Sequence, residues 1–370
     1  MLAQKEPKES YFPFCPVWEL TLECNLNCYH CGSKAGKKRS HELTTKEAIN
    51  LCKQLADIGS KGVALMGGEI FLRKDWETIS REIKNNGMKL SIITNGCVNP
   101  SKVIPILSKI EVDSLSVGLD ASNPSLHDMM RGKKGAFEMA THFLEEAKKA
   151  NLSPSVIMTV SKLNFSDLPN MEKFIVENGY EWQIQMAVPT GRFPKELSLD
   201  YSMYYALGIY VMNLRKRYGK DRIVGTHNLG FHSRYIPNLS GFPSWEYCYA
   251  GCYNLGIESD GSVKGCLPLP NSIEGSVRKT TLKEIWENPN AFSYNRKFDP
   301  EKDLKGFCRT CKYGKTCRGG CNWKSIAFTG HFHQDPYCFY RIEETIYKDR
   351  LKEKIEEIYN SPLFREVDNS

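Results

Sequence analysis

Three cysteines stand close together near the start of the chain: Cys24, Cys28 and Cys31. Thiolates at the spacing C-x3-C-x2-C in one short loop can hold three irons of a four-iron cube and leave the fourth iron without a protein ligand. Iron–sulfur cubes are normally held by four cysteines, so an open iron indicates chemistry rather than a structural role. Half of a zinc site, or three unrelated cysteines, is the alternative that this spacing leaves open.

A second group of cysteines lies far along the chain. Eight of the 14 cysteines fall in the segment from residue 248 to residue 338, and none lies strictly between residues 97 and 248. They are Cys248, Cys252, Cys266, Cys308, Cys311, Cys317, Cys321 and Cys338. In a chain without a secretion signal, such residues are more often metal ligands or catalytic groups than disulfides. The distribution predicts two metal-bearing regions with a metal-free scaffold between them.

The scaffold has to bring distant loops together, and its pattern is regular. Short apolar segments typical of buried strands occur at residues 17–22, 62–66, 89–93, 114–119, 155–160 and 181–188. A helical or loop segment follows each, and the last helix is expected at residues 200–218. This alternation predicts an α/β fold with a parallel sheet covered on both faces. Six such units fit either an open doubly wound sheet or an incomplete barrel.

The chemically active motifs all follow strands. The cysteine loop comes after the first strand, Gly67–Glu69 after the second, Thr94–Gly96 after the third, and Asp120 after the fourth. In both candidate folds, ligands bind at the carboxyl ends of the parallel strands. We therefore expect these groups to converge on one site.

The chain changes character after residue 218. Residues 219–245 contain several glycines and prolines, and we interpret them as an irregular junction. Residues 246–341 are rich in Cys, Gly and Pro, and Asp260-Gly261 between apolar residues predicts a hairpin. A charged amphipathic helix is expected at 342–358 and a frayed tail at 359–370, which together form a last segment, 342–370. A polar lead-in at 1–13 and a core at 14–218 complete the predicted domain organisation.

Composition excludes several classes of protein. The 370 residues are 41% hydrophobic and 25% charged, no apolar run reaches the length of a membrane span, and the N-terminus lacks a signal-peptide core. The formal net charge of +7 counts cysteines as neutral, and thiolates bound to metal would lower it. We therefore expect a cytoplasmic protein that binds neither membranes nor nucleic acid.

Cys24, Cys28 and Cys31, with Gly67–Glu69 one strand later and Thr94–Gly96 one strand after that, make the chain resemble the radical S-adenosylmethionine (SAM) superfamily. The resemblance implies a partial (β/α)6 TIM-like barrel in which SAM chelates the open iron of a [4Fe–4S] cluster. One-electron reduction, by a donor such as flavodoxin or ferredoxin, would then cleave SAM to a 5′-deoxyadenosyl radical.

The resemblance also implies SAM contacts. Tyr29 matches the aromatic residue beside the adenine, and Thr94 and Asn95 are candidate ribose or supporting groups. Gly67 and Gly68 would let the backbone approach the SAM amine, with Glu69 fixing the geometry; a tight strand-to-loop turn is the alternative for the two glycines.

The fourth strand departs from the family pattern. Many members carry Ser-Leu-Asp there, whereas this chain has Gly118-Leu119-Asp120 with Ser116 two residues earlier, so the ribose contact stays open. Arg131 could pair with the SAM carboxylate or be a solvated surface residue. Gln185, on the sixth strand, could face the site or satisfy backbone groups.

The later cysteines resemble a SPASM domain, which carries two auxiliary clusters. The family pattern has C-x(9–15)-G-x4-C, then C-x2-C-x5-C-x3-C, then a last cysteine, and this chain matches every position and adds Cys252. By resemblance to sulfatase-maturating enzymes, the first cluster would be held by Cys248, Cys252, Cys266 and Cys321. The second would be held by Cys308, Cys311, Cys317 and Cys338. Two zinc-ribbon-like sites are the alternative.

With the first loop, this implies three [4Fe–4S] clusters, of which only one is open. Full ligation of the later two indicates electron relay rather than substrate binding. If Cys252 were not a ligand, the first auxiliary cluster would have an open iron that could bind substrate directly.

Relatives of this kind act on peptides or on small molecules. An Asp follows the cysteine equivalent to Cys266 in sulfatase-maturating enzymes, whereas Leu267 follows it here, which disfavours that activity. Only some thirteen residues precede the expected core, so a peptide substrate would need a separate leader-binding protein or direct capture. Cys97, after the third strand, could return a hydrogen atom to a substrate radical or be a half-buried loop cysteine.

We therefore predict an enzyme that abstracts hydrogen from a ribosomally made peptide, giving a cross-link, thioether, oxidised residue or epimer. A small-molecule dehydrogenase or decarboxylase is the alternative. A third hypothesis, from a different functional class, is a metal-stabilised binding protein that catalyses no reaction.

Overall fold

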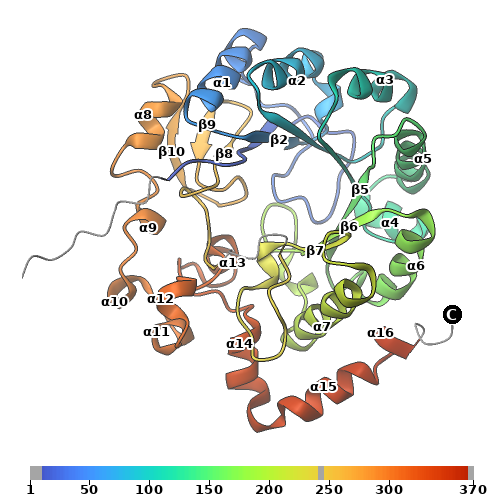
Figure 1. The fold of residues 1–370 in the computed structure, drawn as a ribbon, viewed down its shortest axis with the longest axis vertical. Helices are drawn as coiled ribbons and strands as arrows, with labels where there is room; N and C mark the ends of the chain where they lie inside the picture. The colour runs from blue at the N-terminus through green and yellow to red at the C-terminus, as the bar shows by residue number, and fades with distance from the viewer. Residues whose placement is uncertain (1–10, 241–245, 366–370) are drawn as a thin grey trace, which may run out of the picture.

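The computed structural model describes residues 11–240 and 246–365. Within these ranges the strands form one curved sheet in the order β10-β9-β8-β1-β2-β3-β4-β5-β6-β7 (Figure 1). The strands are β1 (Val17–Thr21), β2 (Gly62–Gly67), β3 (Lys89–Thr94), β4 (Ser114–Gly118), β5 (Ser155–Val160), β6 (Glu181–Met186), β7 (Ile223–Gly225), β8 (Gly256–Ile257), β9 (Ser262–Lys264) and β10 (Ile273–Ser276). Pairing is parallel from β8 through β1 to β7 and antiparallel at β8–β9 and β9–β10. The predicted partial barrel of parallel strands is confirmed.

Helices cover the outer side of this sheet. Those of the first half are α1 (Thr45–Asp57), α2 (Trp76–Asn85), α3 (Pro100–Ile110), α4 (Pro124–Arg131), α5 (Ala136–Lys149), α6 (Leu168–Asn178) and α7 (Tyr201–Tyr218). Local sequence fixes their starts: Thr44 and Glu47 form a reciprocal capping box at the start of α1. No helix within the described ranges is both long and apolar enough to cross a membrane.

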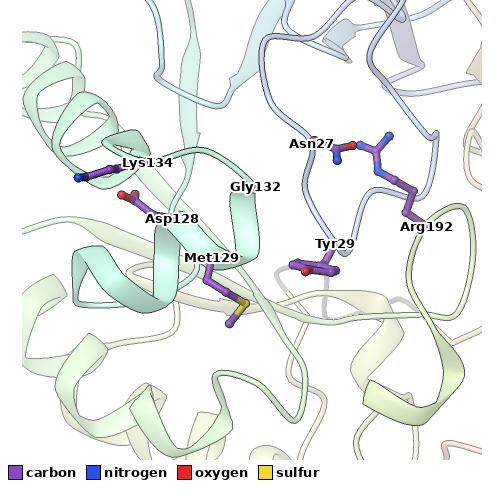
Figure 2. A pocket seen from close by; sticks show the side chains of 7 residues that line it. All are labelled: Asn27, Tyr29, Asp128, Met129, Gly132, Lys134 and Arg192. Carbon is purple, nitrogen blue, oxygen red and sulfur yellow. The ribbon is translucent and has the colours of Figure 1, made fainter.

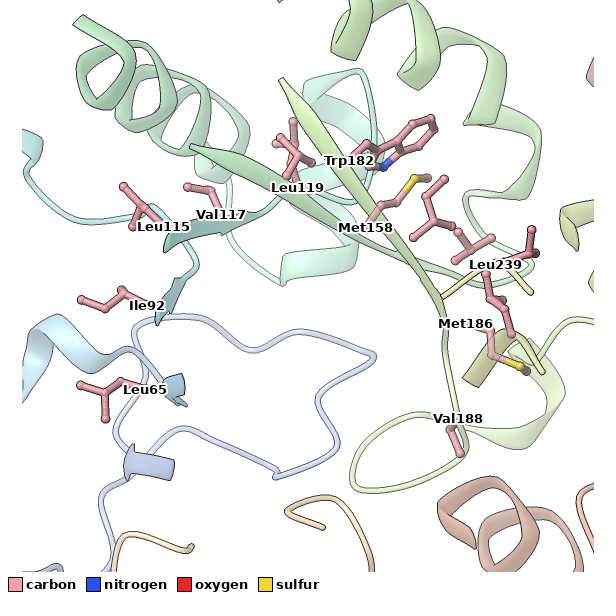
Figure 3. Packing of buried hydrophobic residues seen from close by; sticks show 14 of the residues in the cluster. Leu65, Ile92, Leu115, Val117, Leu119, Met158, Trp182, Met186, Val188 and Leu239 are labelled. Carbon is pink, nitrogen blue, oxygen red and sulfur yellow. The ribbon is translucent and has the colours of Figure 1, made fainter. Parts of the chain in front are cut away.

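The two faces of the sheet differ in polarity because side chains alternate along each strand. Leu65, Ile92 and Val117 are fully buried and point outward, toward the helices (Figure 3). The alternate positions are only half-buried and include Ser91, Ser116, Thr159, Gln183 and Gln185. The inner side of the barrel is therefore polar.

The C-terminal region continues the sheet instead of standing apart. β8 pairs with β1 through Val17 and Trp18, so the cysteine-rich segment is attached to the strand that leads into the first cysteine loop. Its helices are α8 (Leu282–Glu287), α9 (Ser293–Arg296), α10 (Pro300–Asp303), α11 (Phe307–Thr310), α12 (Gly314–Cys317), α13 (Asn322–Thr329), α14 (Phe339–Ile342), α15 (Leu351–Tyr359) and α16 (Pro362–Arg365). In Figure 1, helices α9 to α14 lie between β10 and α7.

Several elements differ from the prediction. The junction is not wholly irregular, because Ile223–Gly225 forms β7 and pairs with β6. The short helix α4 was not expected; Asn123 caps it and Pro124 begins it. The helix expected at 342–358 is broken where Lys348 adopts φ 46°, and α15 begins three residues later.

The two ends of the chain differ from the prediction in part and are described in part. Part of the tail expected at 359–370 is helical, as α16. Most of the lead-in, residues 1–10, lies outside the described residues, as do 241–245 of the junction and 366–370 of the tail.

Candidate functional site

The first cysteine loop is anchored where it leaves β1. Gly68 N donates to Thr21 O at 2.8 Å, and Glu69 N donates to Glu23 O at 2.7 Å. A Cβ atom at position 68 would lie 2.0 Å from Glu23 O, so only glycine allows this approach. The close backbone contact predicted for the glycines thus exists, but its partner is the chain entering the cysteine loop. The predicted contact of Gly67 and Gly68 with SAM stays a prediction.

Glu69 connects two of the predicted motifs. Its carboxylate is fully buried and accepts from Thr94 Oγ1 at 2.8 Å and from Asn95 N at 2.9 Å. Burial raises the pKa of Glu69 to about 6, and these two hydrogen bonds oppose the rise. Asn95 Nδ2 in turn donates to Asn25 Oδ1 at 2.9 Å and lies 3.7 Å from Cys24 Sγ. The motifs after β2 and β3 therefore reach the cysteine loop through one hydrogen-bond chain.

Asp120 and Arg131 form a buried ion pair under the same loop. Arg131 Nη2 lies 2.7 Å from Asp120 Oδ2, and His30 Nε2 lies 3.3 Å from the same oxygen. Burial alone would raise the pKa of Asp120, but the guanidinium and His30 hold it below its ordinary value. Arg131 is 7% exposed, so the surface-arginine alternative is wrong. Its pairing with the SAM carboxylate stays a prediction.

Gly118 explains the departure on the fourth strand. A Cβ atom there would lie 2.6 Å from Arg131 Nη2, so a serine at this position would require the Arg131 guanidinium to shift. Ser116 bonds to Ser155 Oγ at 2.8 Å within the sheet, away from the strand end. Gln185 donates to Thr159 Oγ1 at 3.0 Å on the inner face of the barrel.

Two further elements hold the loop from outside. Backbone carbonyl groups at the end of α4 accept hydrogen bonds from the cysteine loop: Tyr29 N donates to Met130 O at 2.9 Å, and Asn27 N donates to Arg131 O at 3.1 Å. Arg192, in the loop after β6, donates to Cys28 O at 3.0 Å. Sequence reasoning missed the roles of His30, α4 and Arg192. His30 between two of the cysteines was the available signal, whereas nothing local marks Arg192.

An open cleft of about 620 Å³ lies beside the loop, lined by Asn27, Tyr29, Asp128, Met129, Gly132, Lys134 and Arg192 (Figure 2). Tyr29 is 49% exposed and forms part of its wall. Asp128 caps the next helix by accepting from Gly135 N and Phe137 N. The charged residues that line the cleft are therefore two cations, Lys134 and Arg192, and one carboxylate, Asp128.

Cys97 lies deeper than predicted. It is 2% exposed, packs with Leu26 and Cys28, and its Sγ lies 3.6 Å from Ala136 O. Burial raises its pKa to about 12. The reading as a half-buried loop cysteine is corrected to full burial beside the cysteine loop, and its role as a hydrogen donor stays a prediction. Cys52, fully buried on α1, belongs to the main core.

The later cysteines gather as two sets. Burial raises the pKa of Cys252 and of Cys266 to about 12, and a thiolate at the nearby Cys248 adds to both. Cys321 is also close to Cys248 and buried. The other four, Cys308, Cys311, Cys317 and Cys338, line one small cavity. The two groupings are those that the resemblance implied.

The donor chemistry of these sets fits clusters. In the described residues, no three His, Cys, Asp or Glu side chains stand close enough to hold one metal ion. The ligands of a cube bind separate irons and stand further apart than the ligands of one zinc ion. All eight donors are thiols, which is the set that iron–sulfur cubes take.

Comparisons with known proteins agree with this geometry. Residues 18–175 match the radical SAM superfamily model, and residues 248–312 match that of an iron–sulfur cluster-binding domain, SPASM. The chain is 32% identical to an AdoMet-dependent heme synthase of Methanosarcina barkeri in an alignment of 351 positions, which covers 88% of this chain and 96% of that protein. It is 27% identical to the mycofactocin maturase MftC of Mycolicibacterium smegmatis, over 84% of this chain and 78% of that one.

Solved structures share the fold. Streptococcus suis SuiB bound to the precursor peptide SuiA superimposes with a TM-score of 0.71 at 18% identity, covering 89% of this chain and 76% of that one. Native anSMEcpe with bound AdoMet superimposes with a TM-score of 0.67 at 17% identity, covering 94% and 100%. The protein therefore belongs to the radical SAM superfamily, is a radical SAM enzyme, and carries a C-terminal SPASM domain.

Proposed function

We propose that this enzyme abstracts a hydrogen atom from a small molecule that carries carboxylate groups, of the kind found on heme precursors. The observation that carries the proposal is similarity to the heme synthase along 96% of that protein's length. Heme is a macrocycle with carboxylate side chains, and the residues that line the cleft beside Tyr29 include two cations, Lys134 and Arg192, against one carboxylate, Asp128. The alternative of a small-molecule dehydrogenase or decarboxylase is thus favoured over the peptide substrate that the sequence first indicated.

Cys24, Cys28 and Cys31 would hold the SAM-binding cluster, with one iron free for SAM. When bound and reduced, that cluster supplies the electron that cleaves SAM to the 5′-deoxyadenosyl radical. Around it, Glu69 and Asn95 fix the loop from one side and Arg131 from the other. Tyr29, at the edge of the cleft, is placed to cover a flat ring such as adenine.

The two later sets would hold one auxiliary [4Fe–4S] cluster each, which gives three clusters per chain. A small acidic electron carrier, such as flavodoxin or ferredoxin, is the proposed reductant, and a cytoplasmic location remains part of this proposal. Cys252 is proposed as a ligand because its thiol lies close to Cys248.

Anaerobic reconstitution followed by turnover tests this function. We expect about twelve irons per chain, SAM cleavage on reduction, and consumption of a carboxylated iron porphyrin. Its mass loss should match CO₂ plus two hydrogen atoms for each side chain converted to an alkene, because one hydrogen atom passes to the 5′-deoxyadenosyl radical and a proton and an electron leave with CO₂, the electron passing to an auxiliary cluster. A matched porphyrin ester, which lacks the free carboxylates, should not react. SAM cleavage without any change in the porphyrins would refute the substrate class while leaving the enzyme class intact.

A ribosomal peptide is the second candidate. It is supported by similarity to a mycofactocin maturase and by the shared fold with SuiB, which was solved with its precursor peptide. A separate leader-binding protein is its proposed partner. Co-expression with neighbouring short reading frames tests it: one peptide should change in intact mass, and the change should vanish in the variant Cys24→Ala/Cys28→Ala.

A further inference from the structure

The short helix α9 is built against the first auxiliary set of cysteines. Asn295 Nδ2 donates to Cys248 O at 2.7 Å and to Ala250 O at 2.8 Å. Arg296 Nε donates to Gly251 O at 2.6 Å. Together, these two side chains donate hydrogen bonds to three backbone carbonyl groups of the loop that contains Cys248 and Cys252. α9 therefore positions that loop from the side.

Tyr294, on the same helix, has one group that these contacts leave unexplained. Its hydroxyl is buried and has no hydrogen-bond partner among the described residues. Leaving a buried hydroxyl unsatisfied costs about 1–3 kcal/mol, so such a group calls for a partner that the protein atoms do not supply. The ring itself is fixed, because it stacks on Phe332 at 4.7 Å between centroids.

The hydroxyl lies beside the backbone of the residue that precedes Cys266. A Cβ atom at Gly265, the residue before Cys266, would lie 2.1 Å from the Tyr294 hydroxyl. Position 265 is therefore a glycine because the hydroxyl occupies that space. Burial raises the pKa of Tyr294 well above its usual value, and the thiols of Cys248 and Cys266 are close enough to add to this rise.

We propose that the Tyr294 hydroxyl donates a hydrogen bond to a sulfur of the cluster held by Cys248, Cys252, Cys266 and Cys321, and thereby raises the reduction potential of that cluster. Hydrogen bonds to cluster sulfurs stabilise the more negative, reduced state. Tyr294 thus adjusts a reduction potential: it raises that of the first auxiliary cluster and leaves that of the second unchanged. It rests on the proposed function, because it requires that these four cysteines hold a cluster.

The experiment removes one oxygen atom. Full-length Tyr294→Phe is made in the background Cys24→Ala/Cys28→Ala/Cys31→Ala, so that only auxiliary clusters contribute to the spectra. After anaerobic reconstitution, redox titration followed by electron paramagnetic resonance should show one midpoint moved to a more negative value and the other unchanged. In the parent, electron–nuclear double resonance in D₂O should detect an exchangeable proton coupled to that cluster, and this signal should be lost in Tyr294→Phe.

Tyr347→Phe is the matched control, because it also removes a single buried hydroxyl group, on a helical turn after α14. It should leave both midpoints unchanged. Unchanged midpoints in Tyr294→Phe at full iron content, or equal shifts of both clusters, would overturn the proposal. If Cys248, Cys252, Cys266 and Cys321 held no cluster, the parent background would contain about four irons instead of about eight, before any titration. A failure of the proposed substrate class would instead show only in the turnover of porphyrins and would leave both midpoints as expected.

Discussion

The two cysteine-rich regions are held by different kinds of contact. The first loop is fixed by groups from distant parts of the chain, namely Gly68, Glu69, Arg131 and Arg192, and it borders an open cleft. In the later region, Asn295 donates to the carbonyl of Cys248 from within the same segment. Four of the later cysteines, Cys308, Cys311, Cys317 and Cys338, line a much smaller cavity than the cleft beside the first loop. A cluster with an open iron must admit a ligand on one side, so it is supported from the others. Fully ligated clusters need no such opening.

The largest effect should come from removing the cysteines of one region at a time. Cys24→Ala/Cys28→Ala/Cys31→Ala should abolish SAM cleavage and keep about eight of about twelve irons. Cys308→Ala/Cys311→Ala should lose about four irons and still cleave SAM, because its open cluster is intact. Iron analysis and the yield of 5′-deoxyadenosine measure both. SAM cleavage by the triple variant would contradict the proposal that only the first loop holds the SAM-binding cluster.

Arg131→Met should have the next largest effect. It leaves the fully buried Asp120 carboxylate without its guanidinium partner, and burial lowers the pKa of the neighbouring His30, which disfavours a compensating imidazolium. Breaking a buried pair from one side costs about 3–5 kcal/mol. Anaerobic denaturant unfolding followed by circular dichroism measures the free energy of unfolding. Arg131→Lys, which keeps the charge, should lose much less. Equal stability of Arg131→Met and the wild type would show that the ion pair does not support the first loop.

Arg192→Met should have a smaller effect, confined to the first region. It removes the charged hydrogen bonds to Cys28 O and Ala35 O, and hydrogen bonds to charged groups contribute about 1.5–3 kcal/mol each. We expect weaker retention of iron in the first loop and unchanged auxiliary clusters, as measured by chelator challenge and spectroscopy. Arg192→Lys is the control. Iron loss from the auxiliary clusters instead would contradict the regional assignment.

The smallest effect is expected where the two regions meet at the surface. Arg278 Nε lies 2.8 Å from Glu47 Oε1, which joins the segment after β10 to the start of α1. Both side chains are about one-third exposed, at 31% and 37%, so Glu47→Gln should cost about 0.2–1 kcal/mol. Salt should reduce the difference further. A loss of several kcal/mol in the unfolding measurement would mean that the regions depend on each other far more than their contacts indicate.

Much of the fold could be read from local pattern. The strands and most helices were predictable because hydrophobic periodicity and caps such as Thr44 act within a few residues. The strand β7 and the helix α4 were missed because both are short, and Ile223–Gly225 becomes a strand only by pairing with β6. The break at Lys348 was missed for a similar reason, since the charged pattern continues across it.

The kind of chemistry could be inferred from the order of the residues alone: three cysteines in one loop, eight more at fixed spacing, and motifs at strand ends that had to meet. Which contacts those residues make became clear only from the folded chain. Folding placed Gly68 against Glu23 instead of leaving its partner open, put Arg131 into the space over Gly118, and set the Tyr294 hydroxyl beside Gly265. The physical reason is distance along the chain. Spacing and periodicity are patterns among residues that are close in sequence, whereas hydrogen bonds and steric exclusion here involve atoms that only folding brings together.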